Sequence, residues 1–229
     1  MLRARYESAL DALRQASEGR YAPPRIIAVT KTHSPEEILP LYDLGQREIG
    51  ENRVQEILEK WPFLQEKFRF HCIGRLQTNK VKYIMDKVCL IQSLDRMNLA
   101  LEIDRQAQKA GVVMPVLVQV SPAGEEQKGG MPPEDVRAFL NEVRHMDGLH
   151  VEGLMAVMPH TQEQEYLSGL FGQMRTLFEQ LRQEAIPGVD MKELSMGMSG
   201  DYVLAARHGA TMVRLGSALF GPRDYGVVK

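Results

Sequence analysis

The feature of this chain that most constrains its fold is a unit that recurs eight times. Each unit has a short apolar, β-branched run, then a polar or glycine-containing loop, then an amphipathic stretch. The apolar runs fall at residues 25–31, 47–52, 68–74, 88–94, 114–121, 150–158, 191–197 and 211–216. Continuous apolar strands that alternate with helices are typical of a parallel sheet covered on both faces. Eight such units in roughly 190 residues predict a closed (β/α)8 barrel, with a doubly wound open sheet as the alternative.

One extra helix is expected before the first unit, because Leu2, Tyr6, Leu10 and Leu13 recur at helical spacing with charges between them. The whole chain of 229 residues suits a single domain spanning residues 1–229. Within the units, Ser34 and Asp95 each precede a predicted helix. Serine and aspartate are preferred at the N-cap position, so both residues are interpreted as helix caps. The longest helix is expected at residues 164–184.

The composition argues against two classes of partner. The formal net charge of −2 gives no electrostatic basis for binding nucleic acid or an anionic membrane. No apolar run approaches the roughly 20 residues of a membrane-spanning helix. The N-terminus lacks the apolar core of a signal peptide, and its acidic residues argue against a transit peptide. We therefore expect a cytoplasmic protein.

The two cysteines, Cys72 and Cys89, each lie inside an apolar run. They form no Cys-x-x-Cys pair, and no histidine spacing completes a zinc site, so no metal is expected. Buried free thiols in a reducing compartment are the simplest interpretation.

Several polar residues fall at the carboxyl ends of the predicted strands, which is the functional face of a parallel barrel. Lys31 ends the first strand, where a desolvated amine could attack a carbonyl group; a solvated lysine is the alternative. Asn52 ends the second strand and could bind a ligand oxygen or cap the following helix. His71 lies inside the third strand, where a hydrogen-bonded core histidine is the commoner case. The lysines that follow, Lys80 and its neighbours, are interpreted as a solvated face.

The strongest signal comes from the last two units. The loops after strands seven and eight of such barrels commonly bind phosphate, with glycines allowing close approach of the backbone. Ser199, Gly216 and Ser217 are therefore candidate phosphate ligands, with ordinary tight turns as the alternative. Arg214 alternates with apolar neighbours in strand eight and can point into the barrel. Its partner could be the ring nitrogen of a ligand or a carboxylate of the protein.

A primary amine, a phosphate site and an arginine between them match an aldehyde-bearing cofactor with a phosphate arm. At these residues the chain resembles the pyridoxal phosphate homeostasis protein family, a one-domain relative of the alanine racemase barrel. The resemblance covers essentially residues 25–223. Its motifs are Ala28-Val29-Thr30-Lys31, Gly50-Glu51-Asn52 with Val54-Gln55-Glu56, the run at 71–80, Glu152-Gly153-Leu154-Met155, the run at 194–199 with Asp201, and residues 213–221.

The resemblance implies that pyridoxal 5′-phosphate (PLP) is bound as a Schiff base on Lys31. It makes Ser199, Gly216 and Ser217 the phosphate ligands, and Arg214 the partner of the pyridine nitrogen. Asn52 would lie near the cofactor ring. The chain departs from the family where an asparagine usually follows the fifth strand, because Ser121 stands there.

The same residues favour a protein that holds and exchanges the cofactor over an efficient catalyst. Arginine does not take up the proton that an acidic partner would share with the ring nitrogen, so carbanion formation is less favoured. The chain ends about a dozen residues after strand eight, which leaves no room for the second domain of a racemase. PLP homeostasis, with effects on the balance of amino acids and keto acids, is the function that the resemblance implies. A weak amino-acid racemase is the main alternative, and a barrel that binds a phosphorylated metabolite without an imine is another.

A monomer is expected, with PLP-dependent apo-enzymes as possible recipients of the cofactor. Lys128, beside Gly129-Gly130 in the loop after strand five, could accept the aldehyde during release, although an exposed loop lysine is the commoner case.

Overall fold

Each of the eight apolar runs forms a strand in the computed structural model, which describes residues 1–125 and 129–222. The strands are all parallel and close into a barrel in sequence order, so the closed barrel is confirmed over the open sheet. Their bounds are β1 Arg25–Val29, β2 Glu48–Glu51, β3 Arg69–Cys72, β4 Val88–Leu94, β5 Met114–Val120, β6 Leu149–Ala156, β7 Val189–Met198 and β8 Met212–Leu215.

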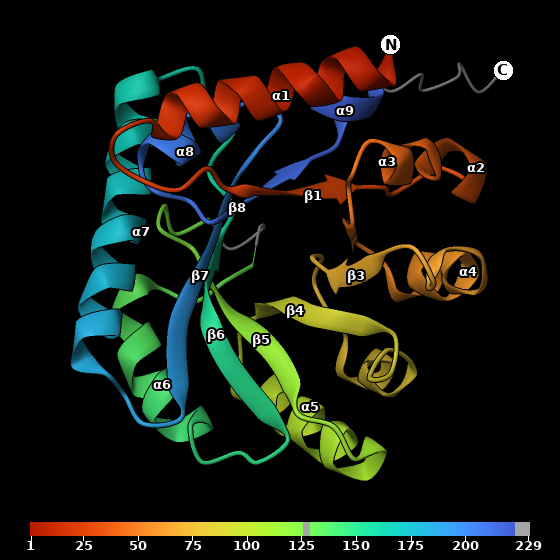
Figure 1. The fold of residues 1–229 in the computed structure, drawn as a ribbon. Helices are drawn as coiled ribbons and strands as arrows, with labels where there is room; N and C mark the ends of the chain where they lie inside the picture. Colours follow the sequence, from red (N-terminus) through yellow and green to blue (C-terminus); the bar gives the residue numbers. More distant parts are fainter. Residues whose placement is uncertain (126–128, 223–229) are drawn as a thin grey trace, which may run out of the picture.

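Helices surround the barrel (Figure 1). They are α1 Leu2–Ser17, α2 Pro35–Ile38, α3 Pro40–Asp43, α4 Val54–Leu64, η1 Thr78–Tyr83, α5 Met97–Ala110, η3 Pro133–Asp135, α6 Val136–Val143, α7 Gln164–Glu184, α8 Tyr202–Arg207 and α9 Ser217–Phe220. The predicted extra helix is α1, which buries Tyr6 and Leu13 and packs against α8 and α9 (Figure 1). The longest helix, α7, has the predicted bounds.

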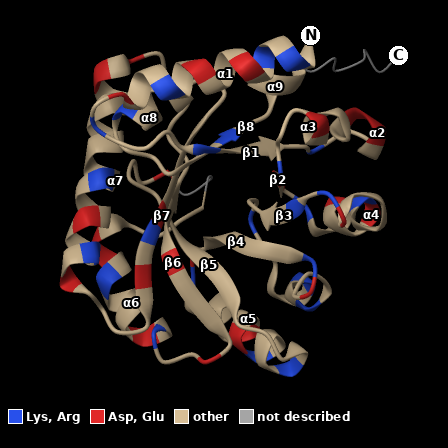
Figure 2. Ribbon diagram, in the orientation of Figure 1, with Lys and Arg blue, Asp and Glu red and all other residues tan. Residues whose placement is uncertain are grey.

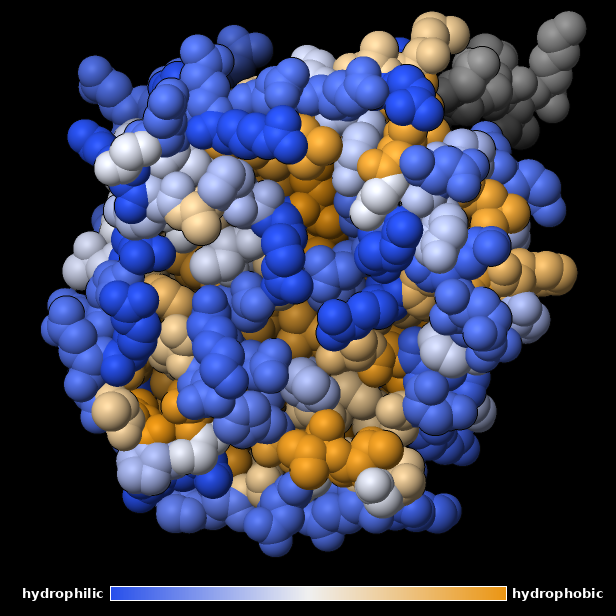
Figure 3. Space-filling view, in the orientation of Figure 1, coloured by the Kyte–Doolittle hydropathy of each residue, from blue (hydrophilic) through white to orange (hydrophobic). Residues whose placement is uncertain are grey.

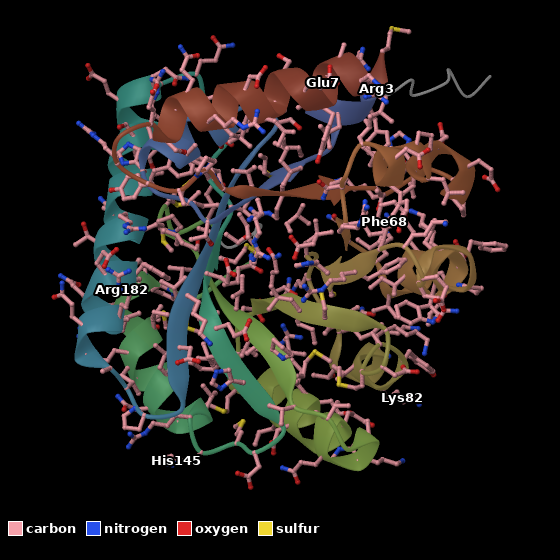
Figure 4. All side chains as sticks on the ribbon, viewed as in Figure 1. Arg3, Glu7, Phe68, Lys82, His145 and Arg182 are labelled. Atoms are coloured by element: carbon pink, nitrogen blue, oxygen red, sulfur yellow. The ribbon has the colours of Figure 1, made fainter. Side chains whose placement is uncertain are left out.

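Two apolar layers hold the fold together. Inside the barrel, Ile27, Leu90, Leu117, Met155 and Met212 form one buried cluster, and side chains fill this space (Figure 4). A much larger cluster joins the outer face of the strands to the helices. The inner and outer sets alternate along the strands, as the pleat of a barrel requires.

Register shifts interrupt several of the strand pairs, and one of them lies at the start of β4. The pairing of β3 with β4 shifts between Phe70 and His71, which face Val88 and Leu90. Cys89 is therefore the extra residue of a β-bulge. Bulges re-aim side chains, and the Cys89 side chain packs against the inner cluster.

The two predicted helix caps have different outcomes. Ser34 is the N-cap of α2, as predicted, and its backbone N–H donates to Glu37 Oε2 at 2.8 Å. The Asp95 prediction is wrong: Arg96 is the N-cap of α5, and the Asp95 carboxylate pairs with the Arg96 side chain instead. An adjacent guanidinium offered the carboxylate a stronger partner than a backbone amide.

Charges of both signs are spread over the helices (Figure 2), and the face in Figure 3 is mostly hydrophilic with apolar patches between. None of the described helices is both long and apolar enough to cross a membrane.

Candidate functional site

All six predicted site residues come from four neighbouring strands, β7, β8, β1 and β2. Val29 pairs with Gly50, so Lys31 and Asn52 follow their strands at the same level. Ala28 pairs with Leu215, which places Gly216 and Ser217 on the other side of the Lys31 loop. Met198 pairs with Arg214, so Ser199 lies beyond it. The strand register thus gathers these residues at one sector of the barrel mouth.

The backbone before Lys31 is held by a buried ionic group. Thr30 donates its hydroxyl proton to Glu51 Oε1 at 2.6 Å, and Lys60 Nζ donates to the Thr30 carbonyl oxygen at 2.8 Å. The ammonium group of Lys60 also lies 2.7 Å from Glu51 Oε1. Burial raises the pKa of Glu51, although the Lys60 charge and the bonds from Lys60 and Thr30 oppose the rise.

The backbone after Lys31 is strained. Thr32 has a φ of 70°, a conformation that β-branched residues rarely adopt. Its N–H donates to Glu56 Oε2 at 2.7 Å, and the same carboxylate accepts a 3.0 Å hydrogen bond from Lys60. Lys31 is therefore held between two residues that β2 and α4 fix in place.

Asn52 lies close to this group and is not a helix cap. Helix α4 begins at Val54 with Arg53 as its N-cap, so the capping alternative is excluded. The side-chain Oδ1 of Asn52 is buried and has no hydrogen-bond partner among the described residues. A buried orphan acceptor at a strand end suits a ligand that donates a proton. The Asn52 backbone also packs tightly on Gly74, where an added Cβ would lie 2.2 Å from the Asn52 carbonyl oxygen.

The residues predicted to bind phosphate meet at the first turn of α9. Ser199 Oγ accepts hydrogen bonds from the backbone N–H groups of Gly216 and Ala218, both at 3.1 Å. A Cβ added at Gly216 would lie 3.6 Å from Val29. Ser217 is exposed beside it. An oxygen atom is thus already held by two converging amides, which is the contact that a phosphate oxygen makes at such a turn.

Arg214 points into the barrel as predicted and is 4% exposed. Its guanidinium donates to the Ser195 carbonyl oxygen at 3.0 Å, to Ser195 Oγ at 2.7 Å and to the Ala156 carbonyl oxygen at 2.8 Å. These contacts use three of the five N–H donors of the group. Burial lowers the pKa of Arg214 to about 10, and Asp201 opposes the shift. At neutral pH the side chain therefore remains a cation and a donor.

A series of polar side chains in contact with one another extends from Arg214 through the barrel interior to His71. Ser195 Oγ donates to Gln92 Oε1 at 2.7 Å, and Gln92 Nε2 lies 3.1 Å from His71 Nδ1. The expected core histidine is only half satisfied, since its Nε2 has no hydrogen-bond partner among the described residues. Glu48 Oε1 lies 3.5 Å from that atom.

A cavity of about 980 Å³ adjoins Asn52. Arg53, Arg75, Lys80 and Arg96 are among its lining residues, which makes the cavity cationic. Lys80 is exposed, as expected for a solvated face.

The remaining predicted residues lie outside this group. Cys72 is buried, but Cys89 is partly exposed, which corrects the expectation for the second thiol. The Ser121 N–H donates to the Met131 carbonyl oxygen at 2.8 Å, so its backbone closes the loop after β5. Lys128 lies outside the described residues, and its role stays a prediction.

Sequence reasoning missed the residues that hold Lys31 in place. Glu56 and Lys60 stand four positions apart on α4, a spacing that places two side chains on one helix face. Glu56 also ends the Val54-Gln55-Glu56 motif, but nothing in the sequence pointed to Lys60 beyond this spacing, which is common on exposed helices as well.

Comparison with known proteins identifies the family of this chain. Residues 4–224 match the family model of the alanine racemase N-terminal domain. A protein of Aquifex aeolicus named pyridoxal phosphate homeostasis protein is 44% identical over 202 residues, which are 88% of each chain. A protein of the same name from Pasteurella multocida is 37% identical over 88% of this chain and 87% of its own.

Solved structures point to the same family and the same fold. PipY of Synechococcus elongatus, described with PLP bound, is 33% identical and superposes with a TM-score of 0.83, covering 96% of this chain and all of PipY. An alanine racemase of Clostridium difficile shares the fold alone, with 16% identity and a TM-score of 0.74 over 97% of this chain and 58% of its own. The chain belongs to the pyridoxal phosphate homeostasis protein family, built on the barrel of the alanine racemase N-terminal domain.

Proposed function

We propose that this protein binds pyridoxal 5′-phosphate on Lys31 and serves PLP homeostasis by holding and exchanging the cofactor. The observation that carries the proposal is the meeting of Lys31, the orphan acceptor of Asn52 and the two amides held by Ser199 at one sector of the barrel mouth. Names of the relatives, and the PLP bound to PipY, support the same cofactor.

The residues present fit the cofactor. When bound, PLP supplies an aldehyde that condenses with a primary amine. Lys31 would provide that amine, at a position fixed by Thr30 and Thr32. Ser199, Gly216 and Ser217 would hold the phosphate, and Asn52 would accept a hydrogen bond near the ring.

Arg214 supports a handling role over efficient catalysis. The guanidinium stays protonated at neutral pH and lies under the mouth, where its remaining N–H groups can donate to a ring nitrogen. A donor there leaves the ring without the extra proton that would make it a strong electron sink. The protein would thus protect a reactive aldehyde without labilising the bonds of a bound amine. We further propose that it acts in the cytoplasm as a monomer, with PLP-dependent apo-enzymes as recipients.

The first experiment is visible absorbance spectroscopy of the purified protein incubated with PLP, before and after borohydride. Wild type and the exposed-site control Lys109→Ala should show an imine band that borohydride abolishes, and Lys31→Ala should lack it. A band of equal strength in Lys31→Ala would overturn the assignment of the lysine. No band in any variant would leave only a phosphate-binding barrel.

Exchange of the α-proton of free amino acids in deuterated water separates handling from catalysis. We expect no turnover above that of free PLP. Rapid exchange or racemisation would favour the weak enzyme instead.

A further inference from the structure

The cavity of about 980 Å³ beside Asn52 contains charges that the proposed function does not use. Its charged lining residues are Arg53, Arg75, Lys80 and Arg96, and no carboxylate lines it in the described part of the chain. Four smaller cavities of the molecule each have at least one carboxylate in their lining, namely Glu134, Glu48, Glu56 and Asp86. Four cations without an acid are unexpected in a chain whose formal net charge is −2. We call this space the cationic cavity.

Three of its four cations are not neutralised by the protein. Arg53, Arg75 and Lys80 form no ion pair with any described residue. Arg96 is the exception: it pairs with Asp95 and donates to a backbone carbonyl oxygen of the loop after β3 at 2.7 Å, which fixes it in place. Like charges that share one cavity repel one another, so an anion that enters relieves this repulsion. The cationic cavity therefore suits a ligand with more than one negative charge.

The cationic cavity lies on the opposite side of Lys31 from the residues proposed to bind phosphate. In the barrel, β1 lies between β8 and β2. Ser199 follows β7 and precedes β8, whereas Asn52 follows β2, and Arg75 and Arg96 follow β3 and β4. All of them lie at the carboxyl ends of the strands. A cofactor held at Lys31 with its phosphate at α9 therefore leaves the cationic cavity to the molecule with which it exchanges.

Asn52 supplies a hydrogen-bond acceptor at the Lys31 end of the cationic cavity. Its Oδ1 is buried and has no partner among the described residues, and Asn52 follows β2 at the level of Lys31. An amide oxygen accepts a proton, which an amino group offers and a carboxylate does not. Leu58 and Tyr83 also line the cavity and provide apolar surface for methylene groups. The lining thus matches a ligand that carries an amino group, a short aliphatic chain and acidic groups.

We propose that the cationic cavity binds an amino acid with two carboxylates and directs its amino group to Lys31 during exchange of the cofactor. Arg53, Arg75 and Lys80 bind the carboxylates, and Asn52 Oδ1 accepts a hydrogen bond from the amine. A single carboxylate would neutralise only one of the three unpaired cations. The volume is also at the upper end of the range of small-molecule sites, about 300–1,000 Å³.

The exchange step rests on the proposed function, whereas the binding of carboxylates does not need the cofactor. In the step, the nitrogen of the incoming amine forms a bond to the carbon that Lys31 holds, and the bond from that carbon to the Lys31 nitrogen breaks. The two N–H protons of the incoming amine end on the Lys31 nitrogen, which is released as a free amine. No oxidant, reductant or further reactant is consumed. The cations take no part in the bond changes and select the amine.

The first test measures binding to the full-length protein, freed of cofactor by dialysis against hydroxylamine, with backbone amide NMR as the readout. Glutamate and glutamine are the matched probes, because they have the same length and differ in one carboxylate. We expect glutamate to shift the amide signals of residues 53–55 and 75–80 saturably, and glutamine to bind at least 5-fold more weakly. Equal affinities, or no saturable shift at these residues, would overturn the proposal. Tighter binding of inorganic phosphate than of glutamate at the same residues would also contradict it.

Variants of exposed residues test the assignment of the cations. Arg75→Gln and Lys80→Gln should each weaken glutamate binding at least 3-fold and leave the affinity for glutamine nearly unchanged. Lys82→Gln is the matched control. Both lysines are exposed on η1 and lie over the Tyr83 ring, at 5.8 Å for Lys80 and 4.9 Å for Lys82, but Lys82 does not line the cationic cavity. Equal effects of the two lysine variants would indicate a general charge effect and contradict the proposal.

The second test follows the loss of the imine band from the PLP-loaded protein after addition of each amino acid at the same concentration. Glutamate should release the cofactor from wild type and Lys82→Gln at least 5-fold faster than glutamine does. In Arg75→Gln the two rates should be nearly equal. Equal rates in the wild type would overturn the role in exchange. The absence of any band in the wild type would instead overturn the proposed function, and the NMR titration would still decide whether the cationic cavity binds carboxylates.

Discussion

The ammonium group of Lys60 donates a 2.8 Å hydrogen bond to the carbonyl oxygen of Thr30, the residue immediately before Lys31. The same ammonium group neutralises the buried Glu51 carboxylate at 2.7 Å. One cation thus links the helix α4, the strand β2 and the loop that carries the proposed attachment lysine.

Replacing Lys60 by methionine should destabilise the protein by about 3 kcal/mol, because Glu51 would keep a buried charge without its partner. The pKa of Glu51, already raised by burial, would rise further. When the pKa of a carboxyl group is higher in the folded than in the unfolded state, the protein loses stability as the pH rises above the unfolded pKa of about 4.3. The loss in Lys60→Met should therefore be larger at pH 8 than at pH 4. Urea unfolding at both pH values measures it, with Lys109→Met as the exposed control; equal losses at the two pH values would contradict this account.

Replacing Ser199 by alanine should weaken PLP binding about 10-fold, since a hydrogen bond to a charged group contributes about 1.5–3 kcal/mol. Pyridoxal, which lacks the phosphate, is the matched ligand and should bind the variant and the wild type equally. Absorbance titrations with the two ligands give both affinities. An equal loss for both ligands would assign Ser199 to the structure of the α9 turn and not to the phosphate.

Replacing Arg214 by methionine should lower the free energy of unfolding by about 3 kcal/mol. The carbonyl oxygens of Ala156 and Ser195 would lose their donors inside the barrel, and each buried unpaired group costs about 1–3 kcal/mol. Arg207→Met, at an exposed position on α8, should change stability by less than about 0.5 kcal/mol. Chemical denaturation of both variants checks the difference, and similar midpoints would show that Arg214 is not needed for the fold.

Replacing Gly74 by alanine should displace Asn52, because the new Cβ would lie 2.2 Å from its carbonyl oxygen. We expect lower stability and weaker PLP binding together, since Asn52 lies at the same level as Lys31. Gly169→Ala is the control: nothing lies within 4 Å of its added Cβ, and it should stabilise α7 by about 0.5–1 kcal/mol. Thermal unfolding and a PLP titration on both variants separate the effects. Unchanged PLP affinity in Gly74→Ala would exclude Asn52 from the site.

Periodicity predicted the strands well because a buried parallel strand needs a continuous apolar run, which is visible in any sequence. The eighth run, at 211–216, became β8 Met212–Leu215, and the others also match within a few residues. The inward direction of Arg214 followed from the same alternation.

The contacts around the predicted residues could not be predicted from the periodicity of the sequence. Asp95 paired with Arg96 rather than with the backbone, a choice between two local partners that the sequence does not rank. The bulge at Cys89 depends on how β4 meets β3, which is a property of the closed sheet. The contact of Lys60 with Thr30 joins residues 30 positions apart, and only the fold brings them together.

Closure of the sheet limits how this protein can meet another. Every strand from β1 to β8 is hydrogen-bonded on both sides, so no row of backbone amides and carbonyls is left open for a peptide to join. A recipient enzyme, as proposed above, could therefore not dock by adding a strand to this barrel in the part of the chain that the structure describes. The proposed recognition would then rest on side chains of the loops and helices, and the loops that carry Lys31 and Ser199 are the ones a cofactor would have to pass.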